Sequence, residues 1–165
     1  MPPETALPAL PFATLLKDFS DLRGFSLQFL RGLDEEEALA QPEGFRNTLH
    51  WNLGHLLYTQ GEALWTWCGL KTPFPVFAPY FGLGTSPADH DSLAPDWDIL
   101  LGLAKRHLVS LPGEVAGRLH QPLNKRWKFM NISMATAGET LPFLIAHEGE
   151  HLAHIKRLRK AVRGA

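Results

Sequence analysis

Two histidines near the end of this 165-residue chain have the spacing of metal ligands on a helix. They are His147 and His151, and residues four apart lie one above the other on the same helical face. Apolar residues with matching helical spacing share that face: Phe143, Leu144, Ile155, Leu158 and Val162. Burying two imidazoles in an apolar core is costly unless a partner binds them. A divalent metal ion is such a partner, because neutral imidazole is a ligand of zinc, nickel and iron.

A metal site of this kind needs a third ligand from elsewhere, since catalytic zinc sites have three protein ligands and one open position. His154 follows on the same helix, but three histidines along one helix spread over roughly 10 Å. That is too far for bonds of about 2.1 Å to one ion, so we expect His154 to be a neighbour of the ligands or partly exposed. The other candidates are His50, His55, His90, His107, His120, Cys68 and the carboxylates. Helical periodicity does not choose between His50 and His55.

The segment 147–151 also matches H-E-x-x-H, the motif of zinc proteases in which the glutamate is the general base. Glu148 is therefore a candidate catalytic residue. Those enzymes take their third ligand downstream, whereas only fourteen residues follow His151 here. In a metal site of another kind Glu148 could still act as a base or acid beside the ligands. Helical angles direct it away from the inner face, however, so a solvated side chain is the alternative. A deformylase-like site with Cys68 as a ligand is a further alternative, although no cysteine motif of that family surrounds it.

Four helices are predicted to position these residues. Apolar residues at three- and four-residue steps indicate helices over 13–33, 47–70, 97–111 and from 138 or 139 to 162. A short helical turn is expected at 34–39. The second helix has a leucine face and an aromatic face, so we expect it to be buried on two sides or to meet a partner subunit. No convincing strand alternation is found, and the pattern predicts an all-α four-helix bundle with long connections.

Two connections carry their own chemistry. Residues 71–95 are rich in proline and aromatic residues, and the aromatic stretch 74–81 is expected to wall the pocket of the metal site or simply to cover the bundle. Residues 114–137 fit no helical pattern and are expected to form a loop with short irregular pieces. They contain a small basic-aromatic patch of Lys125, Arg126, Trp127, Lys128 and Phe129. Contact with an anionic or thiol-containing cosubstrate and plain solvation are both open for this patch.

Composition narrows the class of protein. The length fits one domain, residues 1–165, and a net charge of -1 disfavours nucleic acid as a partner. No apolar run approaches the roughly 20 residues that span a bilayer, and the start of the chain lacks the charged segment of a signal peptide. The single cysteine, Cys68, rules out an intramolecular disulfide and suits a reducing compartment. We expect a cytoplasmic protein.

Two segments together resemble the DinB-like superfamily of metal-binding four-helix bundles. They are residues 47–57 (NTLHWNLGHLL) and 147–155 (HEGEHLAHI). The family pattern is a histidine late in such a segment of the second helix and His-x-x-x-His on the fourth. Carried onto this chain, the resemblance implies His55, His147 and His151 as the metal ligands.

The resemblance also implies a function. Members include thiol-dependent transferases and isomerases, and members often form dimers. For this chain the implied activity is metal-assisted transfer of a low-molecular-weight thiol, or hydrolysis, on a small-molecule substrate. The cofactor would be one divalent ion of zinc, nickel or iron, and the protein a homodimer. A non-catalytic metal-binding or stress-response module is the alternative of another class.

Overall fold

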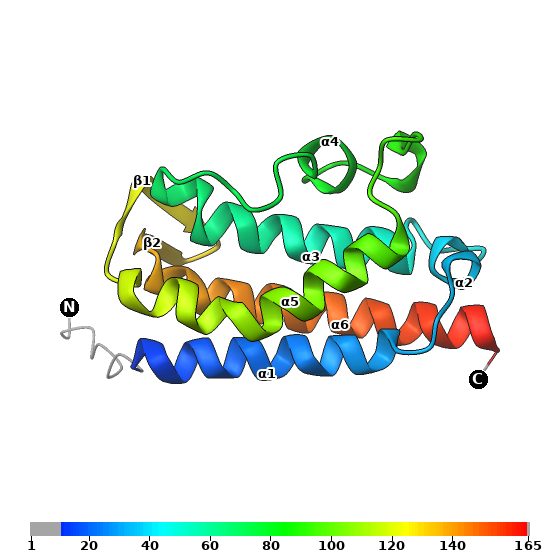
Figure 1. The fold of residues 1–165 in the computed structure, drawn as a ribbon, viewed down its shortest axis with the longest axis horizontal. Helices are drawn as coiled ribbons and strands as arrows, with labels where there is room; N and C mark the ends of the chain where they lie inside the picture. The colour runs from blue at the N-terminus through cyan, green and yellow to red at the C-terminus, as the bar shows by residue number, and fades with distance from the viewer. Residues whose placement is uncertain (1–10, 165) are drawn as a thin grey trace.

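The computed structural model describes residues 11–164, which form a mostly helical fold (Figure 1). The first ten residues, on which the expectation of no signal peptide rests, lie outside this range. The long helices are α1 (Phe12–Leu30), α3 (Leu49–Leu64), α5 (Trp97–Val115) and α6 (Leu141–Arg163), and the short ones are α2 (Glu35–Leu39) and α4 (Ala78–Phe81). Helix α6 packs against α1 and α3, and α5 packs against the same two helices. The helical class expected from the sequence is confirmed.

Side-chain caps begin α2, α3 and α5, and the ends of α1, α3 and α5 differ from the prediction. Thr48 caps α3 by accepting a hydrogen bond from the Trp51 backbone N–H. The second predicted helix was too long, because α3 ends at Leu64 and a short 3-10 turn, Thr66–Cys68, follows. Helix α5 continues past Pro112 to Val115. The side chain of Val115 is fully buried, so its packing outweighs the proline stop signal.

A β-hairpin replaces the irregular segment expected at 114–137. Strands β1 (Pro122–Phe129) and β2 (Ile132–Thr136) pair antiparallel, with Trp127 opposite Met134. The prediction of no strands was therefore wrong. The reason is that β1 is exposed at six of its eight positions, so it lacks the alternation of a half-buried strand. The hairpin contacts the turn after α3 and the turn before α6, at one end of the helices (Figure 1).

The connection from 71 to 95 lies along α3 and covers it. Its rings Phe74, Phe77 and Phe81 are buried in the hydrophobic core. Phe81 lies so close to α3 that a Cβ on Gly54 would be 2.3 Å from its ring, so the glycine permits this approach. Nearly every residue of α3 is buried, which confirms burial on two sides. Because both faces are covered within one chain, they no longer argue for a partner subunit.

No helix among residues 11–164 is long and apolar enough to cross a bilayer.

Candidate metal centre

Three imidazoles converge between α3 and α6. They belong to His55, His147 and His151, and one nitrogen from each lies within 4.8 Å of the others. The Nε2 atoms of His55 and His147 are 3.1 Å apart. We call these residues the histidine cluster. Among residues 11–164 it is the one group of His, Cys, Asp or Glu side chains that meets closely enough to hold a metal ion.

The ring of His55 is fixed by its second nitrogen. Its Nδ1 lies 2.6 Å from the Phe81 carbonyl oxygen, which can only accept a hydrogen bond. The proton is therefore on Nδ1, and Nε2 presents a lone pair to the cluster. Trp51 stacks on the same ring with 4.6 Å between centroids, and the Trp51 indole N–H donates to the Thr85 hydroxyl. The close approach at Gly54 thus serves the site, because it brings the Phe81 carbonyl to His55.

His151 is fixed in the same way by Asn52. Its Nδ1 lies 2.8 Å from Asn52 Oδ1. The Asn52 amide nitrogen donates to Asn47 Oδ1 and to the Thr48 carbonyl, so its oxygen is the atom left to accept from His151. Asn52 is completely buried. The imidazole consequently carries its proton on Nδ1 and keeps an Nε2 lone pair, as a metal-ligating histidine does when its other nitrogen donates to an acceptor.

The surroundings keep the three rings neutral. Burial lowers the pKa of His147 from 6.5 to about 3, with further lowering by His55 and by Arg23. Burial and the neighbouring imidazoles lower the pKa of His151 to about 2. The pKa of His55 is also lowered by burial, against the raising effect of its bond to Phe81. Neutral imidazoles with free Nε2 lone pairs are the form that binds metal.

The cluster fits a divalent ion on these observations. His55 and His151 carry their proton on Nδ1, which is the tautomer of a histidine that binds metal through Nε2. The Nε2 lone pairs of the cluster also outnumber the N–H protons that could be donated to them. An all-nitrogen donor set suits zinc, nickel and iron. Three protein ligands also leave room for water or substrate.

The other candidate ligands lie elsewhere. His50 donates from Nε2 to the Pro95 carbonyl, and His90 lies 3.1 Å from the Tyr80 carbonyl. His154 is partly exposed and lies 2.7 Å from an Arg157 nitrogen, in line with the expectation that it is not a ligand. Cys68 is buried against the Ala63 carbonyl, and neither it, His107 nor His120 belongs to the cluster.

The alternative of a solvated Glu148 was wrong. Glu148 is 1 % exposed, and its two carboxylate oxygens accept from Nε and Nη2 of Arg23 at 2.8 and 3.0 Å. Ser26 donates a further hydrogen bond, and Arg23 also binds Gln60. We call these four residues the ion-pair network. Both oxygens of Glu148 already accept hydrogen bonds inside this network, so this geometry does not support Glu148 as a general base.

The signal for this network was present in the sequence. Arg23 and Ser26 lie on the same stripe of α1 as Phe19 and Leu30, and all four are buried. A charged residue on an apolar stripe requires a buried partner. Helical angles alone could not reveal that α1 covers the outer side of α6.

A cavity of about 420 Å³ opens beside the cluster. His55 and His147 form part of its wall, next to Tyr58 of α3. The wall expected from residues 74–81 is supplied instead by the β-hairpin, the turn after α3 and α6. The lining residues there are Trp67, Trp127, Lys128, Phe129, Met134 and Phe143. Three residues of the basic-aromatic patch found in the sequence, Trp127, Lys128 and Phe129, thus line the cavity.

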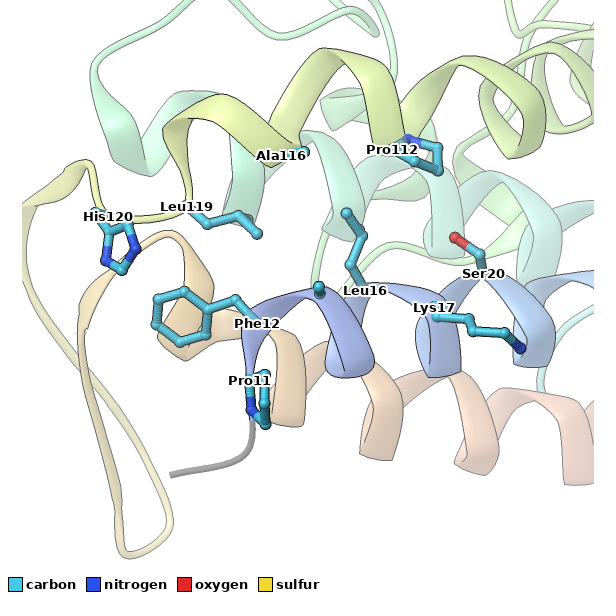
Figure 2. Close-up of a pocket in the computed structure, with 10 residues that line it drawn as sticks. Pro11, Phe12, Leu16, Lys17, Ser20, Pro112, Ala116, Leu119 and His120 are labelled. Carbon is cyan, nitrogen blue, oxygen red and sulfur yellow. The ribbon is translucent and has the colours of Figure 1, made fainter. Parts of the chain in front are cut away.

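A second cavity, of about 730 Å³, lies between α1 and α5 (Figure 2). Its wall is mostly apolar, with Phe12, Leu16 and Leu119 among its residues, and His120 and Lys17 at its edges. None of the histidine cluster borders it. Size alone therefore does not identify the functional site, because the smaller cavity has the metal-binding chemistry.

The comparison with protein families agrees with this geometry. The family model described as DinB superfamily matches residues 18–155, which include all three histidines of the cluster. No curated protein matches the chain.

Proposed function

The chain belongs to the DinB superfamily, and from this premise we propose that it is a metal-dependent enzyme of the thiol S-transferase or hydrolase type. One divalent ion would be held by His55, His147 and His151. The observation that carries the proposal is the convergence of three neutral imidazoles, two of which line a cavity. When bound, a divalent metal supplies a positive charge that lowers the pKa of a thiol or of water, so that the nucleophile forms at neutral pH.

The protein's own groups prepare the site. Phe81 and Asn52 hold the protons of His55 and His151 on Nδ1, so the Nε2 lone pairs stay directed at one point. Because this orientation exists before any ligand arrives, little reorganisation is needed on binding. The aromatic wall gives the space where the substrate lies a largely apolar surface.

Tyr58 is a proton donor at the edge of this space. It borders the cavity next to His55, with ring centroids 6.3 Å apart. Burial raises the pKa of Tyr58, and the nearby Glu62 raises it further. The phenol therefore stays protonated at neutral pH and can donate a hydrogen bond to a substrate oxygen or a leaving group.

In the proposed transfer, a low-molecular-weight thiol loses its S–H proton and its sulfur forms a bond to an electrophilic carbon of the substrate. The leaving group departs with the electron pair of the broken bond and takes up one proton. In hydrolysis, water takes the place of the thiol. Both reactions need the cavity to admit a small molecule, and its volume is within the range of small-ligand sites.

Three further properties belong to this proposal. The packing of α1, α3, α5 and α6 supports the four-helix bundle of the superfamily. A cytoplasmic location and a homodimer remain predictions. The dimer is tested by measuring the molecular mass of the protein in solution.

Elemental analysis of the purified protein is the first test. We expect nearly one divalent ion per chain after growth with zinc, nickel and iron supplied, and almost none in His147→Ala. The matched control is His154→Ala, which removes an imidazole from the same helix outside the cluster and should keep the metal. A wild-type protein that carries no metal would contradict the proposal.

Turnover is the second test. Metal-loaded protein is screened against a panel of low-molecular-weight thiols with electrophiles, and against ester and amide substrates in water. We expect activity that disappears with a chelator and returns when the metal is restored. A protein that binds metal stoichiometrically but turns over none of these substrates would be a non-catalytic module instead.

A further inference from the structure

The cavity beside the histidine cluster has a continuous aromatic wall that begins on the hairpin. Trp127 of β1 stacks on Trp67 with 4.2 Å between ring centroids. Phe143 of α6 lies 6.0 Å from Trp67 and 5.0 Å from Phe129. The series ends at the imidazole of His147, 5.8 Å from Phe143. An apolar molecule lying along this wall would therefore have one end at the histidine cluster.

The part of the same cavity that the hairpin lines carries a positive charge. Lys128 is the one cationic residue in the lining, and no carboxylate among residues 11–164 forms an ion pair with it. Lys125 and Arg126 precede it on the strand, and the hairpin, residues 122–136, contains no acidic residue. The acidic residue of the lining, Glu62, already accepts a hydrogen bond from the Thr66 hydroxyl at 3.0 Å. This hydrogen bond leaves the negative charge of Glu62 in place. Glu62 belongs to α3, however, so the charge on the hairpin side of the cavity is positive.

From these two features we propose that the cavity selects small molecules with an apolar body and an anionic group directed at the hairpin. The apolar body lies against Trp67, Trp127 and Phe143, and the anion pairs with Lys128. The inference rests on the proposed function in naming this molecule as the substrate, and its binding is measurable without any reaction. A cavity of about 420 Å³ accommodates a ligand of this size.

The test compares three probes of one shape and different charge: phenylbutyrate, phenylbutanol and phenylbutylamine. Binding to the full chain is measured by isothermal titration calorimetry, in metal-free and metal-loaded samples. We expect phenylbutyrate to bind about fivefold or more tightly than phenylbutanol, and phenylbutylamine to bind most weakly. The preference should shrink as salt is raised, because Lys128 is exposed and its charge is screened.

Two variants on β1 test whether the charge of Lys128 causes this preference. Lys128→Glu should remove the preference for phenylbutyrate and favour phenylbutylamine. Arg126→Glu makes the same charge change at an exposed residue of the same strand that does not line the cavity, and it should keep the wild-type order. Circular dichroism checks that both variants fold.

Equal affinity for the three probes, or no binding of any, would overturn the inference. So would an unchanged preference in Lys128→Glu, or a preference seen only with metal present, because the ion would then be selecting the carboxylate. Metal content measured on the same samples separates the two proposals. Probe binding without metal uptake contradicts the proposed function alone, and metal uptake without probe binding contradicts this inference alone.

Discussion

His147 and Glu148 are neighbours on α6, yet their polar groups meet opposite conditions inside the protein. The carboxylate of Glu148 enters the ion-pair network, where Arg23 and Ser26 satisfy both of its oxygens. The imidazole of His147 enters the histidine cluster, where its Nε2 faces the lone pair of His55 Nε2 at 3.1 Å. Both oxygens of Glu148 are satisfied by hydrogen bonds within the chain. In the histidine cluster, the ring nitrogens that can accept a hydrogen bond outnumber the N–H protons that could be donated to them.

This difference separates a structural polar group from a functional one. Both groups lose hydration, and a buried polar group needs a partner to offset that loss. The carboxylate of Glu148 has its partners within the chain, so it needs no partner from outside. In the histidine cluster, Phe81 and Asn52 fix the rings of His55 and His151 through Nδ1, and the Nε2 lone pairs stay free. Rigid, neutral and unsaturated nitrogens are what a metal ion requires.

The largest effect is expected from breaking the ion pair of Arg23 and Glu148. Glu148→Leu leaves the Arg23 guanidinium buried without its counter-ion, and we expect a loss of about 3–5 kcal/mol in the free energy of unfolding. Urea denaturation measures it. The double variant Arg23→Leu/Glu148→Leu should recover much of the loss, because it removes both charges together. If Glu148→Leu instead kept its stability and lost its metal, the carboxylate would belong to the metal centre.

The next effect concerns the residue that orients a ligand without touching the metal. Asn52→Leu removes the acceptor that keeps the proton of His151 on Nδ1, and we expect metal affinity to fall about 10- to 100-fold. Asn52→Asp keeps an acceptor and should lose less. Affinity is measured by competition with a chelator, and nitrogen chemical shifts report the tautomer of His151. An unchanged affinity in Asn52→Leu would show that the hydrogen bond does not prepare the site.

Asn52 also illustrates the limit of inference from the sequence. Histidine spacing and family resemblance were sufficient to find His55, His147 and His151, and helical periodicity was sufficient to find the long helices. Periodicity reports only the direction of a side chain from its own helix. It cannot tell which helix lies opposite, so the partners of Asn52 and of Glu148 were invisible.

The hairpin was missed for a related reason. Most of β1 is exposed, so its sequence lacks the apolar alternation on which strand prediction depends. Its basic and aromatic residues were noted, but only the folded chain brings Trp127 against Trp67 beside the histidines. The cavity wall was consequently assigned to residues 74–81, whose rings belong to the core.

Acid should destabilise the metal-free protein through the histidine cluster. The pKa values of His147 and His151 are about 3 and about 2 in the folded chain, below their ordinary value of 6.5. Between these limits the unfolded chain binds more protons, so stability is complete above about pH 6.5 and is lost as the pH falls. We expect the melting temperature of chelator-treated protein to drop from pH 7 to pH 5.

The double variant His147→Leu/His151→Leu tests whether these two histidines cause the pH dependence of the melting temperature. It should flatten the dependence without abolishing it, because burial also lowers the pKa of His50 and His55. The window from pH 7 to pH 5 avoids the carboxylates, whose ordinary pKa values lie lower. A slope equal to that of the wild type would mean that the two histidines are already protonated, or exposed, in the folded protein.

The smallest effect is expected from His147→Leu alone, measured without metal at pH 7. The substitution removes an imidazole whose Nε2 has only His55 as a partner and replaces it with an apolar side chain beside Phe143. Since no buried charge is left unpaired, we expect the free energy of unfolding to change by less than about 1 kcal/mol. With metal added, the wild type should gain stability by mass action, about 2.7 kcal/mol at one hundred times the dissociation constant, and His147→Leu should gain almost none. A loss in the metal-free variant as large as that of Glu148→Leu would make His147 a structural residue, and the two sides of α6 would then not differ in kind.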